Sequence, residues 1–286
     1  MATIIFKNLA QKLLIFQFLI AGLISGCNKP NDVALPSTVE QKPSNSKQNI
    51  DTPELILSAA ASMQDVLREI EQLYINKYPQ AKIIFNFGSS GSLQRQIAQG
   101  APVDIFISAA PQQMNDLADR ELILNETRQD LVKNQMVLVT PQDNQLINNF
   151  DDLIGQSAKQ IALGDPNSVP AGKYAQEILT NLNLINDVKT KTVYGKDVRQ
   201  VLNYVATGNI EAGIVYRTDL ATTKKVKIVA TALQATHSPA IYPIAVVKDS
   251  NHPEAAKQLL EFLFSPQAQA IFEKYGFMTI GKSKGF

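Results

Sequence analysis

The chain has 286 residues, of which 45% are hydrophobic and 19% charged, which is typical of a folded protein long enough for two domains. Its formal net charge of +1 provides no basic face for nucleic acid. With one cysteine, neither a disulfide framework nor a cysteine-based metal site can form within one chain.

The N-terminal segment has the pattern of an export signal. Lys7 and Lys12 stand beside an apolar core over residues 13–23, which is too short for an ordinary membrane span. This core runs into Ile24-Ser25-Gly26-Cys27, which resembles the lipobox of bacterial lipoproteins. We therefore predict a lipoprotein signal peptide over residues 1–26 and acylation of Cys27. The alternative is a plain secretory signal in which Cys27 is incidental.

Residues 27–52 differ in composition from the rest of the chain. They are rich in Pro, Asn, Ser, Gln and Lys and contain few bulky apolar side chains. Such a segment cannot bury enough apolar surface to offset the entropy lost on ordering. We predict a flexible tether, with ordered structure beginning near Pro53.

Three strand–helix units follow the tether. Apolar runs predict strands over residues 54–58, 82–87 and 103–108. Helical spacing of apolar residues predicts helices over 63–74, 93–99 and 111–120. Three such units in succession imply a parallel sheet with helices on both faces.

A second set of units follows a strand at 135–140. The pattern predicts strands over 160–163, 188–194, 212–216, 226–230 and 241–247, and a long turn over 164–172. It predicts helices over 173–182, 198–207, 253–264 and 266–275. The expected fold class is therefore α/β, with two lobes and a cleft lined by strand ends and helix N-termini.

The serine-rich turn between strand 82–87 and the next helix is a candidate anion site. Ser89, Ser90 and Ser92 stand where a buried strand turns into a helix, and Ser62 lies at an equivalent junction. A helix N-terminus presents unpaired N–H groups and a favourable dipole to an anion. The alternative is that these residues only cap their helices.

Residues for catalysis are missing from this pattern. Gly88-Ser89-Ser90-Gly91 departs from the nucleophile elbow at Ser92, and no P-loop lysine follows the turn. The two histidines, His237 and His252, do not have metal-ligand spacing. We therefore predict a binding protein and not an enzyme.

Further hydrogen-bond donors are expected at three positions of the second half. Ala171 and Val198 begin or precede predicted helices, and Tyr216 ends a predicted strand. The five candidate donors are Ser62, Ser90, Ala171, Val198 and Tyr216. None of them is Lys or Arg, and a pocket that only donates suits a fully deprotonated oxyanion. The alternative is that Ala171 and Val198 serve packing and that Tyr216 is a buried sheet aromatic.

Eight short strings in order resemble one family, the molybdate-binding proteins of bacterial molybdate ABC importers. The resemblance covers about residues 54 to 280. The strings are A-A-A-S at 59–62, F-G-S-S-G-S-L at 87–93, G-A-P-V-D-I-F-I-S-A at 100–109, G-D-P at 164–166, V-P-A-G at 169–172, D-V-R at 197–199, G-I-V-Y at 213–216 and K-Y-G-F at 274–277.

The resemblance implies a periplasmic-binding-protein fold of type 2, with lobe I over residues 53–135 and 239–286 and lobe II over 136–238. The lobes would be joined by crossing segments near 134–140 and 235–243. By similarity, molybdate or tungstate would be held without a cofactor or a direct protein–metal bond, through Ser62, Ser90, Ala171, Val198 and Tyr216. The implied protein is an exported, lipid-anchored monomer, in the periplasm or on the outer face of the cytoplasmic membrane, that docks on an ABC permease.

Two alternatives stay open at the level of sequence. The same fold could bind sulfate, phosphate or ferric ion: phosphate would need an acceptor such as Asp165 or Asp197, and ferric ion a cluster of Tyr194, Tyr216 and Tyr242. The other alternative is a sensor or interaction lipoprotein that binds no oxyanion.

Overall fold

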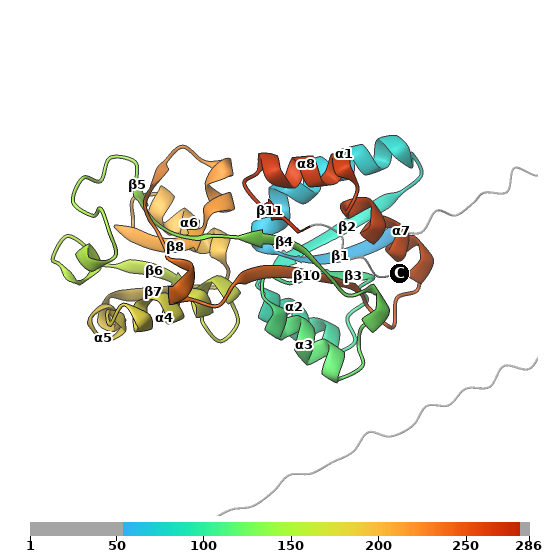
Figure 1. Ribbon diagram of the computed structural model, residues 1–286, viewed down its shortest axis with the longest axis horizontal. Coiled ribbons are helices and arrows are strands. Elements are labelled where there is room, and N and C mark those ends of the chain that lie inside the picture. Colours follow the sequence, from blue (N-terminus) through green and yellow to red (C-terminus); the bar gives the residue numbers. More distant parts are fainter. Residues whose placement is uncertain (1–53, 281–286) are drawn as a thin grey trace, which may run out of the picture. The chain divides into compact units, whose positions relative to one another are not determined.

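The computed structural model of the protein describes residues 54–280 (Figure 1). The predicted signal peptide, the tether and Cys27 lie outside the described residues. The strands form one six-stranded and one five-stranded sheet. We call the six-stranded sheet with its helices lobe I, and the five-stranded sheet with its helices lobe II.

Lobe I is built on a mixed sheet with strand order β11-β4-β10-β3-β1-β2. Strand β1 pairs in parallel with β2 and β3, whereas β10 runs antiparallel to β3 and β4. The predicted parallel arrangement therefore holds for the βα units but not for the returning chain. The strands are β1 (Glu54–Ala60), β2 (Lys82–Gly88), β3 (Ile105–Ile107), β4 (Gln129–Asn134), β10 (Ala240–Val246) and β11 (Met278–Thr279).

The helices of lobe I cover both faces of this sheet. In Figure 1, α1 and α8 lie together above the sheet and α2 and α3 lie together below it. Each helix has an apolar stripe that the sheet buries, as an amphipathic helix requires. The helices are α1 (Gln64–Lys77), after the short 3-10 helix η1 (Ala61–Met63), α2 (Ser90–Ala98), α3 (Pro111–Asp119), α7 (Pro253–Leu263) and α8 (Pro266–Lys274).

Lobe II repeats this plan with the strand order β7-β6-β8-β5-β9. Strand β6 pairs parallel with β7 and β8, and β5 pairs antiparallel with β8 and β9. In Figure 1, α6 lies above this sheet and α4 and α5 lie below it. The elements are β5 (Met136–Pro141), β6 (Ile161–Gly164), α4 (Pro170–Asn181), α5 (Ile185–Val188), β7 (Thr192–Gly195), α6 (Val198–Ala206), β8 (Ala212–Tyr216) and β9 (Val226–Thr231).

Short 3-10 helices complete the connections. They are η2 (Asn125–Thr127), η3 (Asp151–Ile154), η4 (Lys189–Lys191), η5 (Arg217–Thr222) and η6 (Gln234–Thr236). Within residues 54–280, none of the helices combines the length and the apolar character that a membrane crossing requires.

The chain crosses between the lobes twice. Gln135 alone separates β4 of lobe I from β5 of lobe II, and residues 232–239 lead from β9 back to β10. Both crossings fall within or beside the predicted segments. The exact residues at which the lobes begin and end stay a prediction. The distribution of strands between the two sheets is compatible with that prediction.

Several predicted elements need correction. Helix α4 begins at Pro170, three residues before the predicted start, because proline fits the first helical position, where its missing N–H has no partner to lose. The predicted strand 188–194 is strand only from Thr192, because α5 and η4 occupy residues 185–191. In addition, β3 is confined to three residues of the predicted 103–108.

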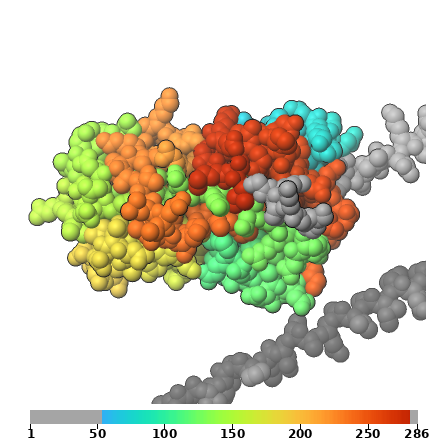
Figure 2. All heavy atoms as spheres, in the orientation of Figure 1, coloured from blue at the N-terminus to red at the C-terminus, as the bar shows by residue number. Residues whose placement is uncertain are grey.

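The two lobes are in direct contact. On the face shown in Figure 2, orange atoms of lobe II lie beside the red C-terminal helices of lobe I. The amide of Asn134 at the end of β4 donates to Thr218 Oγ1 in η5 at 2.8 Å, which ties lobe I to lobe II near the short crossing. The lobes therefore touch beside this crossing.

Candidate ligand-binding cleft

A small cavity lies where the two lobes meet. Its volume is about 10 Å³, close to the space that one water molecule needs. No Lys, Arg or His is among its lining residues, which come from both lobes and include all five predicted binding residues. The lining residues are Ala60, Ala61, Ser62, Gly88, Ser89, Ser90, Ala109, Val169, Pro170, Ala171, Asp197, Val198 and Tyr216.

The position of this cavity follows from the strand directions. Parallel strands β1 and β2 end at one edge of their sheet, and β6 and β7 end at the corresponding edge of the other. The next helix along the chain after each of these strands is η1, α2, α4 and α6, respectively. Four helix N-termini therefore converge on the cleft, where their unpaired N–H groups favour an anion.

The two serines at the start of α2 have different roles. Ser89 is the N-cap: its Oγ accepts the N–H of Ser92 at 3.4 Å and donates to Ser92 Oγ at 2.9 Å. Ser90 is fully buried, and its Oγ accepts the N–H of Ala109 at 2.9 Å. Since this bond leaves the Ser90 hydroxyl hydrogen free, Ser90 is the serine of this turn that can donate to a ligand.

Ser62 is held from inside lobe I. It is buried in η1, and its Oγ lies 2.9 Å from the phenol oxygen of Tyr242 on β10. The Tyr242 phenol is also within reach of the Asn134 amide, whose Nδ2 donates to it at 3.3 Å. Ser62 therefore enters the cleft as part of a buried hydrogen-bonded chain.

Ala171 and Val198 contribute backbone N–H groups to the cleft. Each lies in the first turn of its helix, where an N–H has no acceptor within the helix. Helix α6 is capped by Asp197, whose Oδ1 accepts the Gln200 N–H at 2.9 Å. This cap uses one carboxylate oxygen of the acidic residue that lines the cavity.

Tyr216 supplies an unpaired donor. It ends β8 with 1% of its surface exposed, and its phenol oxygen is buried without a hydrogen-bond partner. Burial raises the pKa of this phenol well above its ordinary value, so it keeps its hydrogen. An unsatisfied buried hydroxyl is costly, and a ligand oxygen in the cavity would satisfy it.

The lobes meet beside the cavity through backbone. The N–H of Gly91 in α2 donates to the carbonyl of Ser168, which precedes α4, at 2.9 Å. A Cβ added at Gly91 would lie 2.7 Å from that carbonyl oxygen and 2.9 Å from the Ser168 Cα. Closure at this point therefore requires a residue without a side chain.

An arginine spans the cleft behind the cavity. Arg199 of α6 lies 3.2 Å from Asp219 of lobe II and 2.6 Å from Asp65 of lobe I, and it donates to the Ser62 carbonyl at 3.4 Å. Asp219 also accepts the N–H of Tyr216 at 3.1 Å. Burial raises the pKa of the Asp219 carboxyl to about 6, against the lowering effect of Arg199. Two carboxylates thus balance the Arg199 charge outside the cavity.

The family model for bacterial extracellular solute-binding proteins matches residues 55–278, nearly all of the described chain. This chain belongs to that family. It is an exported solute-binding protein, and its fold, two α/β lobes of the periplasmic-binding-protein type around a cleft, agrees with the prediction.

Relatives with higher similarity carry more specific names. The solute-binding protein is 49% identical over 224 residues to a putative ABC transporter substrate-binding lipoprotein, YvgL, of Bacillus subtilis, covering 78% of this chain and 85% of that one. It is 38% identical to the molybdate-binding protein ModA of Haemophilus influenzae, covering 77% and 87% of the two chains. These relatives are named for transport and binding and not for an enzymatic activity, as predicted.

A solved structure from Clostridium difficile, the substrate-binding domain of a putative molybdenum ABC transporter, is also similar. It is 45% identical, with a TM-score of 0.63, and the match covers 79% of this chain and 99% of that one. Because family and relatives agree, this solute-binding protein is the binding component of an ABC transporter.

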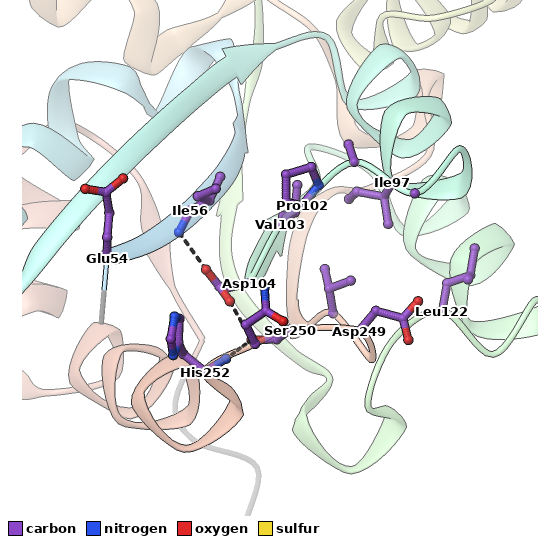
Figure 3. Close-up of a pocket in the computed structure, with 14 residues that line it drawn as sticks. Glu54, Ile56, Ile97, Pro102, Val103, Asp104, Leu122, Asp249, Ser250 and His252 are labelled. Atoms are coloured by element: carbon purple, nitrogen blue, oxygen red, sulfur yellow. Dashed lines mark hydrogen bonds between the residues drawn. The ribbon is translucent and has the colours of Figure 1, made fainter. Parts of the chain in front are cut away.

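The solute-binding protein has a larger cavity of about 290 Å³ in lobe I, away from the cleft (Figure 3). Two of its polar side chains, Asp104 and Ser250, are paired with each other and with backbone. Asp104 accepts the Ile56 N–H at 2.7 Å and the Ser250 hydroxyl at 2.5 Å, and Ser250 Oγ accepts the His252 N–H at 3.1 Å. These bonds join β1 to the loops beside β3 and α7, so the polar groups are structural.

The residues required by the alternative ligands assemble only in part. Tyr194 is 54% exposed and does not line the cleft, although Tyr216 and Tyr242 lie 5.6 Å apart between ring centroids. Of the two acceptors named for phosphate, Asp165 does not line the cavity, whereas Asp197 does, with its Oδ1 already accepting the Gln200 N–H. In the part of the chain that the structure describes, no group of three or more acidic, His or Cys side chains is placed to hold a metal ion.

Sequence reasoning missed the residues that support the cleft from behind. Asn134 and Tyr242 lie 72 and 180 residues from Ser62 along the chain, so no local motif could connect them. Ser168, which meets Gly91 across the cleft, stood in a predicted turn with no stated role.

Proposed function

We propose that this protein captures molybdate, and tungstate with similar strength, in the cleft between the lobes and delivers it to the membrane permease of an ABC importer. The observation that carries the proposal is the small cavity in which donors from both lobes converge without a cationic side chain. A bound oxyanion would accept hydrogen bonds from Ser62, Ser90 and Tyr216 and from the N–H groups of Ala171 and Val198. Relatives named for molybdate or molybdenum support this choice of oxyanion.

Capture would be coupled to closure. A ligand that accepts hydrogen bonds from both lobes stabilises the closed arrangement, in which the Gly91 and Ser168 backbones meet. Sulfate has the same charge and shape as molybdate but is smaller, so its oxygens would not reach all donors at once. Tungstate is nearly the same size as molybdate, and the cleft should scarcely separate the two.

Isothermal titration of the full-length chain with molybdate, tungstate, sulfate and phosphate tests this function. We expect one-to-one binding of the first two ions, much weaker binding of sulfate and phosphate, and a clear loss of affinity in Ser90→Ala. Preferential binding of sulfate or phosphate would assign the cleft to a different anion. No binding of any oxyanion would favour a sensor or interaction protein.

We further propose that Cys27 is acylated and tethers the mature chain, as a monomer, to the outer face of the cytoplasmic membrane. The sequence Ile24-Ser25-Gly26-Cys27 and the name of the Bacillus subtilis relative as a lipoprotein support this. In cells, Cys27→Ser should move the protein from the membrane fraction to the soluble fraction. Unchanged membrane association of the variant would contradict the tether.

A further inference from the structure

The hydroxyl of Ser62 belongs to a buried chain of hydrogen bonds whose direction can be determined. Ser62 Oγ and the Tyr242 phenol oxygen lie 2.9 Å apart, and either group could donate to the other. Which one donates decides whether Ser62 offers a hydrogen or a lone pair to the cleft. The rest of the chain resolves this ambiguity.

Asn134 sets the direction. Its Oδ1 accepts the N–H of Gln135 at 2.9 Å, so its Nδ2 faces the other way and donates to Thr218 Oγ1 at 2.8 Å and to the Tyr242 phenol oxygen at 3.3 Å. An amide nitrogen can only donate. The Tyr242 phenol therefore accepts from Asn134, and Ser62 Oγ is the remaining partner for its own hydrogen.

As a consequence, the Ser62 hydroxyl accepts from Tyr242 and can only donate to the cleft. Tyr242 is fully buried, so an unbonded phenol hydrogen would be costly, and donation to Ser62 avoids that cost. Burial also raises the pKa of the Tyr242 phenol above its ordinary value, so the hydrogen is retained. With its oxygen occupied by Tyr242, Ser62 directs its hydroxyl hydrogen into the cleft.

We propose that Tyr242, oriented by Asn134, is a positioning residue that fixes the Ser62 hydroxyl as a donor and thereby selects fully deprotonated oxyanions over protonated ones. This inference rests on the proposed function, because it concerns an oxyanion held in the same cleft. The Ser90 hydroxyl is likewise made a donor to the cleft, because its oxygen accepts the backbone N–H of Ala109. A side chain controls Ser62, however, and so its polarity can be changed by substitution.

Tyr242→Phe tests the proposal with little change in packing, because the ring and its edge contacts to Tyr216 and Phe277, each at 5.6 Å between centroids, are kept. Without the phenol, Ser62 can turn and accept a hydrogen from a ligand. At neutral pH, phosphate carries at least one proton and molybdate carries none. We expect molybdate affinity to fall about threefold to tenfold, and the preference for molybdate over phosphate to fall about tenfold.

Phosphate affinity would be measured in the full-length chain by displacement of bound molybdate. Tyr74→Phe is the matched control, since Tyr74 is a buried tyrosine of lobe I whose phenol bonds to Gln258 at 3.5 Å outside the cleft. This control should leave both affinities unchanged. A second variant, Asn134→Asp, replaces the donor amide by an acceptor, which should draw the Tyr242 hydrogen away from Ser62. We therefore expect Asn134→Asp also to lower the preference for molybdate over phosphate.

The outcomes separate the two proposals. If the wild type binds molybdate and Tyr242→Phe weakens molybdate and phosphate equally, Tyr242 only supports the cleft and the inference is overturned. Unchanged affinities in Tyr242→Phe would overturn it as well. If the wild type binds no molybdate, the proposed function itself fails, and the inference fails with it.

Discussion

The cavity in lobe I and the cavity between the lobes differ in whether their polar side chains already have hydrogen-bond partners. The cavity in lobe I has about 290 Å³ and contains several acidic and polar side chains, whereas the cavity between the lobes has about 10 Å³. In the larger one, Asp104 and Ser250 form hydrogen bonds within the protein. In the smaller one, the Tyr216 phenol has no partner, and the Ser90 hydroxyl accepts a bond that leaves its hydrogen free.

We expect unpaired donors to identify the binding site of this protein better than cavity volume does. A buried polar group that is already paired gains little from a ligand, while a buried group without a partner gains a full hydrogen bond. Substitutions in the cleft should therefore change affinity with little effect on stability. Substitutions in the lobe I cavity should do the opposite.

The largest effect on binding is expected at Gly91. A side chain there would collide with the Ser168 backbone of the other lobe, so Gly91→Val should hold the cleft open and lower molybdate affinity about 100-fold. Gly91→Ala, with a smaller obstruction, should cause a smaller loss. Calorimetric titration measures both, and small-angle scattering should show that bound Gly91→Val stays more open. Wild-type affinity in Gly91→Val would contradict this account of closure.

Tyr216→Phe should be next in size. Removing a phenol that donates to a charged ligand should reduce molybdate affinity about tenfold to fiftyfold. The thermal midpoint of the unliganded protein should stay the same or rise, because the phenol has no partner before the ligand arrives. A fall in the midpoint without a change in affinity would mean that Tyr216 has a structural role only.

Substitutions of the adjacent serines Ser89 and Ser90 should affect different properties, one the stability and the other the molybdate affinity. Ser90→Ala should lower molybdate affinity about tenfold, since its hydroxyl is free to donate. Ser89→Ala should keep wild-type affinity but reduce the free energy of unfolding by about 1 kcal/mol, because it removes the N-cap of α2. Titration and chemical denaturation of both variants check this. The reverse pattern would assign ligand binding to Ser89.

The smallest effect on affinity is expected in the lobe I cavity. Asp104→Asn disturbs the bonds to the Ile56 N–H and the Ser250 hydroxyl, and should lower the free energy of unfolding by about 1–3 kcal/mol. Molybdate affinity should stay within about twofold of wild type, because no donor of the cleft changes. A large loss of affinity in a stably folded Asp104→Asn would show that this cavity takes part in binding.

Local sequence patterns predicted the strands that are apolar throughout, but not those that depend on pairing with distant strands. Strand β8 was predicted with its observed bounds, since five consecutive buried residues leave little ambiguity. Strand β4 was missed, because Gln129–Asn134 mixes polar and apolar residues and becomes a strand through pairing with β10. The strand predicted at 188–194 was partly wrong for the opposite reason, since its first residues continue a helical turn.

The candidate site shows the same limit. Ser62, Ser90 and Tyr216 could be selected because each stands at a recognisable strand end, and the structure brings them to one cavity. Their roles toward a ligand stay a prediction. The sequence named Tyr242 only as a possible ligand of ferric ion, and its role in orienting Ser62 could not be predicted, because that contact arises only when distant segments pack together.

The allocation of donors between the lobes has a consequence for unloading. Ser62 and Ser90 belong to lobe I, while Ala171, Val198 and Tyr216 belong to lobe II. Because no cationic side chain lines the cavity, no long-range attraction would retain the anion once the lobes move apart. Separating the lobes would remove one group of hydrogen bonds all at once and expose the other group to water. A permease could therefore discharge the cargo by mechanical separation alone, without supplying a competing charge.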